Sequence, residues 1–454
     1  MRKLFIKFKD RLTSSYWFFP STLFFMALIG ALITLNLDFN HKKEIGNFLK
    51  NVFFLKELSL STVRTYLGTL VGAVITVVGV VFSLTILTVS TASSQFGPRI
   101  LNNFMRDRGN QVTLGVYTST FVYASTILIC LYEDPELAFV PYLSIFVSYL
   151  LALSCIGFLI YYIHHIPNSL RIESIVYKIA TQTIDMIDKK FPEEEKLKNM
   201  DVLDSPKKVE EYKELESNLS FETYSNSVGY VQAIDLEGIT SWAKDEDIQL
   251  CLNLRPGDFS NGRVVLARTS GELSNKQRQE LNDFYAYGEG RTLPQNLMYL
   301  FSQLIEVAVR ALSPGINDPI TAMSCIDWME AALMKMIDKD TKYSVIRDEN
   351  SVARVLIRPL CTEEIFEHLN KGLSQYVATS YSTSMHWMSS LNRMHLAAKS
   401  SGQRKAIEHC ARILYSSCRD TVSVQSELHK MHRVFQAFNV LGVEHKSGTT
   451  NPIQ

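Results

Sequence analysis

Four long stretches without a single charged residue constrain the fold of this chain most strongly. They cover residues 17–37, 65–94, 111–132 and 138–163, in roughly the first third of the 454 residues. A helix needs about 20 consecutive apolar residues to cross the hydrocarbon core of a bilayer, and buried helices of soluble proteins rarely stay uncharged for so long. The sequence therefore predicts an α-helical membrane domain with four transmembrane helices within residues 1–165.

Charges in the connecting segments predict how these helices are oriented. The N-terminal segment and the loop between the second and third helices are basic, whereas the loop between the third and fourth helices carries three acids and no Lys or Arg. Because Lys and Arg concentrate in cytoplasmic loops, we expect a multi-pass protein of a bacterial inner membrane with both termini in the cytoplasm. Residues 38–66 depart from this pattern, since they would lie outside yet hold four lysines and one arginine.

The second predicted helix carries a seam of small and polar residues. Spacings of three and four residues connect its members, which places them along one narrow face of the helix. The seam consists of Thr69, Gly72, Thr76, Gly79, Ser83, Ile86, Ser90 and Ser93. Such a face either lets helices pack closely or lines an aqueous path at the centre of a homo-oligomer. In the second case Ile86, the only large apolar member, would form a ring that closes the path by dewetting.

Several functional classes are disfavoured by what the chain lacks. None of the four stretches contains Asp, Glu, Lys, Arg or His, which energised transporters normally place inside the membrane. Lys and Arg total 46, as do Asp and Glu, so no basic excess directs the chain to nucleic acid. The seven cysteines include no Cys-x-x-Cys pair, and we find no catalytic constellation or phosphate loop. We therefore expect no enzyme, no metal and no cofactor.

Residues 166–220 connect the membrane part to the rest of the chain. Ile172, Ile175, Ile179 and Ile187 recur at near-helical spacing and predict an amphipathic helix, which a charged linker or solvated helix follows. His164 and His165 directly precede this segment. Such a pair fits a helix end at the lipid interface, with metal binding or pH sensing as the alternative.

The remainder of the chain predicts an α+β cytoplasmic domain. Residues 228–234, 248–254 and 263–267 have the composition of strands and indicate a small β-barrel or sandwich within residues 221–270. Residues 271–442 are mainly helical in pattern and predict a helical bundle. Within it, apolar residues from 410 to 438 recur at helix-packing spacing, which also allows an oligomer seam. The polar residues 443–454 are expected to be a disordered tail.

Four positions in predicted loops of this domain are candidates for a functional role. Asp258 lies in the turn Arg-Pro-Gly-Asp-Phe, and Arg291 lies in the short segment Gly-Glu-Gly-Arg-Thr, which lacks the lysine of a phosphate loop. Asn317 and Asp318 form a corner between two predicted helices. Because Pro319 follows, Asp318 is expected to cap the second helix. A ligand or metal role for this corner is the alternative interpretation.

Several segments together resemble a bacterial family of predicted inner-membrane proteins that is known only as a domain of unknown function. These segments are residues 81–83 (VFS), 92–99 (ASSQFGPR), 229–235 (GYVQAID), 255–259 (RPGDF) and 310–319 (RALSPGINDP). The resemblance extends over roughly residues 10–440 and implies the same architecture, but it implies no activity. Two positions depart from the family pattern: Ser260-Asn261-Gly262 follows the turn, and Asn296 stands where an Asp is expected.

Two functions from different classes agree with these features. The first is a homo-oligomeric channel or passive conduit with a cytoplasmic regulatory domain, which the polar seam without intramembrane charge favours. The second is a membrane-anchored scaffold or sensor that binds a cytoplasmic partner or ligand without transport. The expected partners are the lipid bilayer, further copies of the chain, and an unidentified ion, small ligand or cytoplasmic protein.

Overall fold

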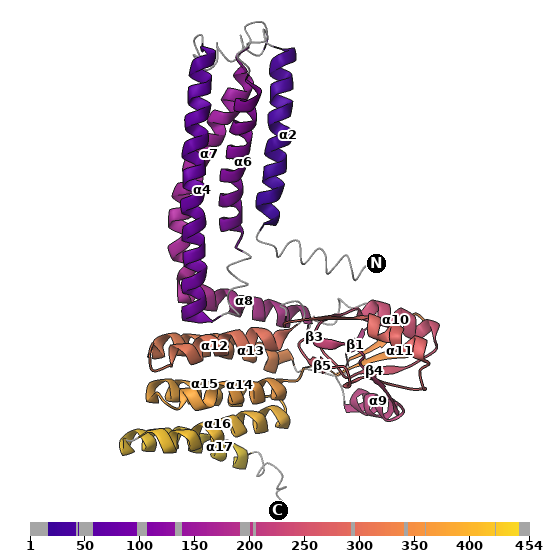
Figure 1. The fold of residues 1–454 in the computed structure, drawn as a ribbon. Coiled ribbons are helices and arrows are strands. Elements are labelled where there is room, and N and C mark those ends of the chain that lie inside the picture. The colour runs from indigo at the N-terminus through magenta and orange to yellow at the C-terminus, as the bar shows by residue number, and fades with distance from the viewer. Residues whose placement is uncertain are drawn as a thin grey trace, which may run out of the picture. The chain divides into compact units, whose positions relative to one another are not determined.

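A computed structural model of the chain consists of two compact units, residues Met1–Ser174 and Ile175–Gln454, which Figure 1 shows in one ribbon. The structure describes residues 17–41, 44, 58–97, 107–131, 139–190, 200–202, 206–291, 296–339, 344–358, 360–422 and 424–444. The predicted tail beyond residue 444 and much of the predicted linker, residues 191–199 and 203–205, lie outside the described residues.

The first unit contains four helices that are long and apolar enough to cross a membrane, as the sequence predicted. They are α2 (Phe18–Asn40), α4 (Leu60–Phe96), α6 (Arg108–Cys130) and α7 (Tyr142–Leu170). With 37 residues, α4 is about 55 Å long at 1.5 Å per residue, well beyond the roughly 30 Å of a hydrocarbon core. The helix therefore extends past the apolar layer if it crosses the membrane.

Helix α6 is the most buried helix of this unit. Of its apolar stretch, 56% is buried, against 11% in α2, 17% in α4 and 22% in α7. Its side chains Tyr123, Ala124 and Ile127 form a core with Ala31 of α2 and Leu67 of α4. Large apolar side chains of α2 and α7 are exposed, among them Phe25, Ile33, Ile156 and Ile160. Exposed side chains of this type suit contact with lipid.

At one end of the bundle, a buried carboxylate of α2 caps the start of α7. Asp38 is only 3% exposed. Its carboxylate accepts hydrogen bonds from the backbone N–H groups of Leu143 and Ser144, both at 2.9 Å, and from the Ser144 hydroxyl at 2.7 Å. The N-cap residue of α7 itself, Pro141, supplies no side-chain cap. Asp38 therefore satisfies N–H groups that would otherwise have no partner at a helix start.

At the opposite end, the N-cap of α6 contacts α7. Asp107 accepts hydrogen bonds from the backbone N–H groups of Gly109 and Asn110. His165 Nε2 lies 2.9 Å from the Asp107 carboxylate, and Tyr161 stacks on the imidazole with ring centroids 5.1 Å apart. Helix α7 runs through both histidines to Leu170, so this pair does not end the helix. Within the described part of the chain, no group of three or more His, Cys, Asp and Glu residues could hold a metal ion.

The second unit contains two open sheets. The six-stranded sheet has the order β1 (Met200–Val202), β8 (Ser344–Arg347), β9 (Ala353–Ile357), β4 (Leu250–Leu252), β6 (Val265–Thr269) and β2 (Phe221–Tyr224). Its neighbouring strands are antiparallel except for the parallel pair β4 and β9. The three-stranded sheet is antiparallel, with the order β5 (Phe259–Asn261), β3 (Val228–Ile234) and β7 (Tyr285–Gly288).

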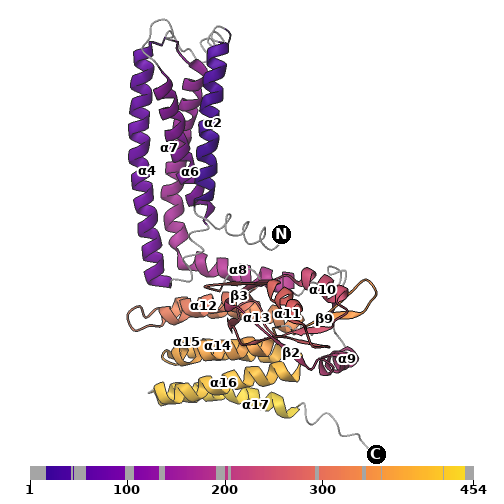
Figure 2. The same ribbon diagram turned by 45° about the vertical axis from the view of Figure 1, so that its right-hand side comes forward.

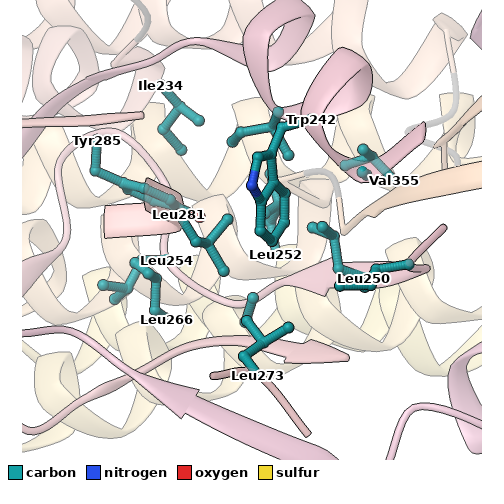
Figure 3. Close-up of a cluster of buried hydrophobic side chains, with 14 of the residues drawn as sticks. Ile234, Trp242, Leu250, Leu252, Leu254, Leu266, Leu273, Leu281, Tyr285 and Val355 are labelled. Atoms are coloured by element: carbon teal, nitrogen blue, oxygen red, sulfur yellow. The ribbon is translucent and has the colours of Figure 1, made fainter. Parts of the chain in front are cut away.

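Both sheets share one hydrophobic core with two helices, α10 (Leu236–Asp245) and α11 (Asn275–Asp283). Figure 3 shows Trp242 of α10 among Leu250, Leu252 and Leu281. This arrangement confirms the predicted α+β class, and the described strands form open sheets instead of a closed barrel. Strands also come from outside the range 221–270, and α9 (Pro206–Ser217) packs near the six-stranded sheet through Tyr212, which lies beside Cys251.

Six further helices of the second unit form three stacked pairs, which Figures 1 and 2 show as layers. They are α12 (Leu297–Ala311), α13 (Pro319–Lys339), α14 (Thr362–Val377), α15 (Tyr381–Ala397), α16 (Ser401–Thr421) and α17 (Gln425–Glu444). Arg393 of α15 forms a bidentate ion pair with Glu330 of α13. Helix α8 (Ile172–Lys190) also contacts α13, through an ion pair between Asp188 and Lys335.

The apolar pattern between residues 410 and 438 does not form one continuous seam. It is split between α16 and α17. Tyr415 and Phe435 stack with ring centroids 4.9 Å apart, and Leu414, Met431 and Phe438 are buried within the chain. This periodicity therefore reports packing between two helices of the same chain.

Candidate functional site

The polar seam lies on the outward face of α4. Of its eight members, seven are exposed and Ser93 is half-buried. The residues of α4 that pack inside the unit include Val63, Leu67, Val74 and Val81, each at most 4% exposed. At 3.6 residues per turn, these residues fall on the face of the helix opposite the seam. The seam therefore points away from the other described helices of the first unit.

Nothing in the described part of the chain packs on the glycines of the seam. A Cβ built at Gly72 or Gly79 would meet no heavy atom within 4 Å beyond the local backbone. The hydroxyls of Thr69, Thr76 and Ser83 each donate to the carbonyl four residues earlier, at 2.8 Å. Their donors are thus satisfied by the helix, whereas their oxygen atoms remain able to accept a hydrogen bond from water.

Large apolar side chains flank the seam on both sides. Ile75 and Phe82 lie along one flank, and Val80 along the other; all are between 40% and 53% exposed. Ile86 is the one large apolar residue within the seam and is 53% exposed. The exposed faces of α2 and α7 are instead dominated by Phe, Leu and Ile. The outward face of α4 therefore differs from the other exposed faces of the unit.

In the second unit, the structure places Asp258 in a tight turn attached to β3. The Asp258 carboxylate accepts a hydrogen bond from the backbone N–H of Arg255 at 2.8 Å. The backbone of the turn bonds to β3 twice, through Gly257 N–H to the Val231 carbonyl at 2.8 Å and Val231 N–H to the Asp258 carbonyl at 2.9 Å. The Arg255 side chain forms an ion pair with Glu364 of α14 at 2.8 Å. Asp258 thus shapes the turn.

The structure brings Arg291 against this turn. Its Nε donates to the Gly257 carbonyl at 3.1 Å, and its guanidinium lies over the ring of Tyr230, 5.4 Å from the centroid. The Tyr230 ring meets the edge of Phe259 with centroids 5.1 Å apart. We call these four residues, Arg291, Tyr230, Phe259 and Gly257, the Arg291 cluster. It joins three of the segments that the sequence singled out, namely residues 229–235, 255–259 and 288–292.

Three glycines allow the segments around the Arg291 cluster to converge. A Cβ at Gly257, where φ is +101°, would lie 2.2 Å from the Asn296 amide nitrogen. A Cβ at Gly288 would lie 2.0 Å from the Gln232 amide nitrogen, and one at Gly229 would lie 2.9 Å from the Gly288 carbonyl oxygen. Asn296 also caps α12 by accepting from Tyr299 N–H at 3.0 Å. Larger residues at the three glycine positions would push these segments apart.

The corner at Asn317 and Asp318 is a helix start. Asp318 accepts hydrogen bonds from the Thr321 backbone N–H, at 3.1 Å, and from the Thr321 hydroxyl. The hydroxyl bond is the main cause that lowers the pKa of the Asp318 carboxyl below its ordinary value. Asn317 is exposed and has a φ of +49°. Among the described residues, no hydrogen bond or ion pair joins this corner to the Arg291 cluster.

Sequence reasoning did not single out Tyr230, Phe259 or Asp38. Tyr230 and Phe259 lie in motifs that carried the family resemblance, and their neighbours Val231 and Ser260 point inward and are buried. The period of two in a strand places alternate residues on the opposite face. This alternation is the sequence signal that could have placed Tyr230 and Phe259 on the outer face of the sheet. For Asp38, the signal was an acid placed one residue beyond an apolar stretch.

Comparisons with known proteins agree with the presence of membrane helices. A family model described as "Predicted membrane protein (DUF2254)" matches residues 13–393. Uncharacterized proteins of Mycobacterium tuberculosis and Mycobacterium bovis are 30% identical to the chain over 284 residues, which is 61% of this chain and 53% of each relative. The chain thus spans about half the length of the curated relatives it matches. No solved structure matches the chain.

Proposed function

The chain belongs to this family of predicted membrane proteins, and from this premise we propose that it forms a homo-oligomeric passive conduit in a bacterial inner membrane. Both termini and the second unit lie in the cytoplasm in this proposal, because the loop between α6 and α7 carries acids and the N-terminal segment carries Lys and Arg. The second unit then serves as a regulatory domain.

The observation that carries the proposal is the direction of the polar seam. Small residues turned toward lipid gain no close packing, whereas the same residues between helices allow the backbones to approach. Seven of the seam's eight members are exposed, and in the described part of the chain no atom lies within 4 Å of a Cβ built at Gly72 or Gly79. A second copy of α4 would cover it, and several copies would surround an axis. We therefore place α4 at the shared axis of the oligomer.

The chemistry of the seam favours passive flow through that axis. Hydroxyl oxygens with free acceptor capacity would face the axis at Thr69, Thr76 and Ser83. Among the described residues of α4, the only charged side chain is Arg64, and it donates to the Leu131 carbonyl at 2.7 Å. Ile86 lies between Ser83 and Ser90 and would make the driest ring. Such a ring can close a path by dewetting.

Conductance measurements on reconstituted protein test the proposal. Ile86→Ser should raise the leak of vesicles or planar bilayers, because it removes the apolar ring. Leu84→Ser is the matched control, since Leu84 is 41% exposed and lies about 160° around the helix from Ile86. A leak from Ile86→Ser alone supports the conduit. If neither variant leaks while the protein is folded and oligomeric, the conduit is contradicted.

The alternative function is a membrane-anchored sensor without transport. The observation that favours it is the Arg291 cluster, which is built from three converging segments and lies at the surface of the second unit. In this case α4 would only hold copies together. The Ile86→Ser variant would then assemble normally and conduct nothing, whereas a ligand or partner would bind to the second unit.

A further inference from the structure

The guanidinium of Arg291 is held in place with its outer edge free. The bond from its Nε to the Gly257 carbonyl and the Tyr230 ring beneath it fix the plane of the group. In the described part of the chain, its two terminal nitrogens have no hydrogen-bond partner, and the side chain is exposed. A planar guanidinium offers two parallel N–H groups that match the oxygens of a phosphate or carboxylate. Because it is already oriented, less rotamer entropy is lost when it binds.

An aromatic surface lies directly beside this cation. Tyr230 and Phe259 are paired across β3 and β5, and Phe259 is 51% exposed. Val231 and Ile234 of β3 belong to the hydrophobic core, in which Figure 3 labels Ile234, so the outer face of the small sheet is left for other contacts. The two rings are inclined to each other by 64°, so the exposed ring of Phe259 is the one that offers a face on which a planar ring can stack.

The side-chain amide of Gln232 lies next to these aromatic rings. Gln232 is the extra residue of a bulge, since Val231 pairs with Tyr287 and Ala233 pairs with Ala286. Its amide nitrogen donates to the Gly290 carbonyl at 3.1 Å. Within the described residues its amide oxygen accepts no hydrogen bond, so it can accept one from a hydroxyl or amino group. Bulges often re-aim a side chain at a functional site.

We propose that the Arg291 cluster binds a nucleoside phosphate. The phosphate pairs with the terminal nitrogens of Arg291, and the base stacks on Phe259 beside Tyr230. The Gln232 amide oxygen accepts a hydrogen bond from the sugar or base. A simple anion would use only the guanidinium, and an apolar ligand would use only the rings. A ligand with a phosphate, a planar ring and donor groups uses all three features. This proposal concerns the second unit and does not depend on the conduit.

The test is a titration of the full-length purified protein with nucleoside mono-, di- and triphosphates, followed by calorimetry. Arg291→Lys keeps the charge but removes the paired N–H groups, and should weaken binding by about 10-fold or more. Phe259→Leu removes the stacking surface and should weaken it by about 5-fold or more. Arg263→Lys is the matched control, because Arg263 is an exposed arginine beside β5, and it should leave affinity within about 2-fold.

Thermal unfolding of each variant separates loss of binding from loss of folding. Arg291 and Phe259 are both exposed, so their variants should unfold at the temperature of the wild type. The proposal is overturned if no nucleoside phosphate binds at millimolar concentration, or if Arg291→Lys binds as tightly as the wild type. It is also overturned if inorganic phosphate binds equally well, or if only vesicles of anionic phospholipid bind. None of these outcomes affects the conductance test of the conduit.

Discussion

Replacing Asp38 with alanine should destabilise the membrane unit substantially. The Asp38→Ala variant removes the acceptor for the N–H groups of Leu143 and Ser144 and for the Ser144 hydroxyl. A buried donor left without a partner costs about 1 to 3 kcal/mol. Two backbone donors give about 2 to 6 kcal/mol, and partial access of water to a helix end favours the lower part of that range. We therefore expect a loss of about 2 to 4 kcal/mol.

The labelling rate of a buried thiol measures this loss. Cys155 of α7 is 6% exposed, so a thiol reagent reaches it only when the bundle opens. Since 1.4 kcal/mol is a factor of ten in an equilibrium constant, Asp38→Ala should speed labelling of Cys155 by about 30-fold to about 700-fold. Cys130 is exposed and serves as an internal control that labels at the same rate in every variant. Mass spectrometry of peptides resolves the two sites.

Two further variants make the reasoning on Asp38 specific. Asn40→Ala changes an exposed residue on the same helix, whose amide donates to the Asn36 side chain, and should alter Cys155 labelling by less than about 3-fold. Ser144→Ala removes only the hydroxyl donor and should cost about 1 kcal/mol. If Cys155 is labelled as slowly in the Asp38→Ala variant as in the Asn40→Ala variant, the Asp38 carboxylate does not hold α7 and the reasoning is refuted.

Three other predictions concern assembly, capping and pH. Gly79→Leu should disrupt the oligomer because Gly79 lies in the seam, whereas Gly157→Leu on α7 should not. At neither site does an added Cβ meet an atom within 4 Å in the described part of the chain, so neither variant should disturb packing within one copy. Mass measurement in lipid discs decides, and equal behaviour would contradict the role of the seam. Asp318→Ala should lower the free energy of unfolding by about 0.5 to 2 kcal/mol, and Asp318→Asn should be nearly neutral; a large loss with Asn in chemical denaturation would indicate a role beyond capping. The hydrogen bond from the Arg354 guanidinium lowers the pKa of Asp348. The ionised Asp348 carboxylate therefore stabilises the fold at pH values above its unfolded pKa of about 3.9. This stabilisation is lost as the pH falls through the lower pKa that Asp348 has in the folded state. The difference in thermal stability between wild type and Asp348→Asn should accordingly shrink below about pH 4, and a difference that grew there would refute this assignment.

The membrane helices were predictable because their signal is local. An uncharged stretch of spanning length needs no knowledge of the rest of the chain, and the spacing of the polar seam follows from the helix period. The direction of the seam was not predictable, since it depends on which face of α4 packs on α6 and α7. Asp38 was also missed, because its partner Ser144 lies 106 residues away and no local pattern connects them.

For the second unit, the sequence predicted the α+β fold class but not the pairing of the strands. The range 228–234 forms a strand over those same residues, because Val, Tyr and Ile dominate it and turn residues bound it. Strand β9 was not foreseen as the parallel neighbour of β4, since Leu250 pairs with Val355 more than one hundred residues later. Asp258 and Arg291 were each named from sequence. Their meeting at Gly257 depends on long-range pairing of β3, β5 and β7, which sequence patterns do not reveal.

The reactivity of a thiol placed within the seam tests the central claim most directly. Ser83→Cys is made in a Cys130→Ser background, because Cys130 is exposed, and Ile156→Cys on α7, 58% exposed, is the matched control for a residue facing lipid. If α4 faces a shared aqueous axis, the Ser83→Cys variant should react with a water-soluble thiol reagent and form disulfide-linked dimers in the membrane, while Ile156→Cys should do neither. A monomer in which the Ser83→Cys thiol is as unreactive as that of Ile156→Cys would contradict the account.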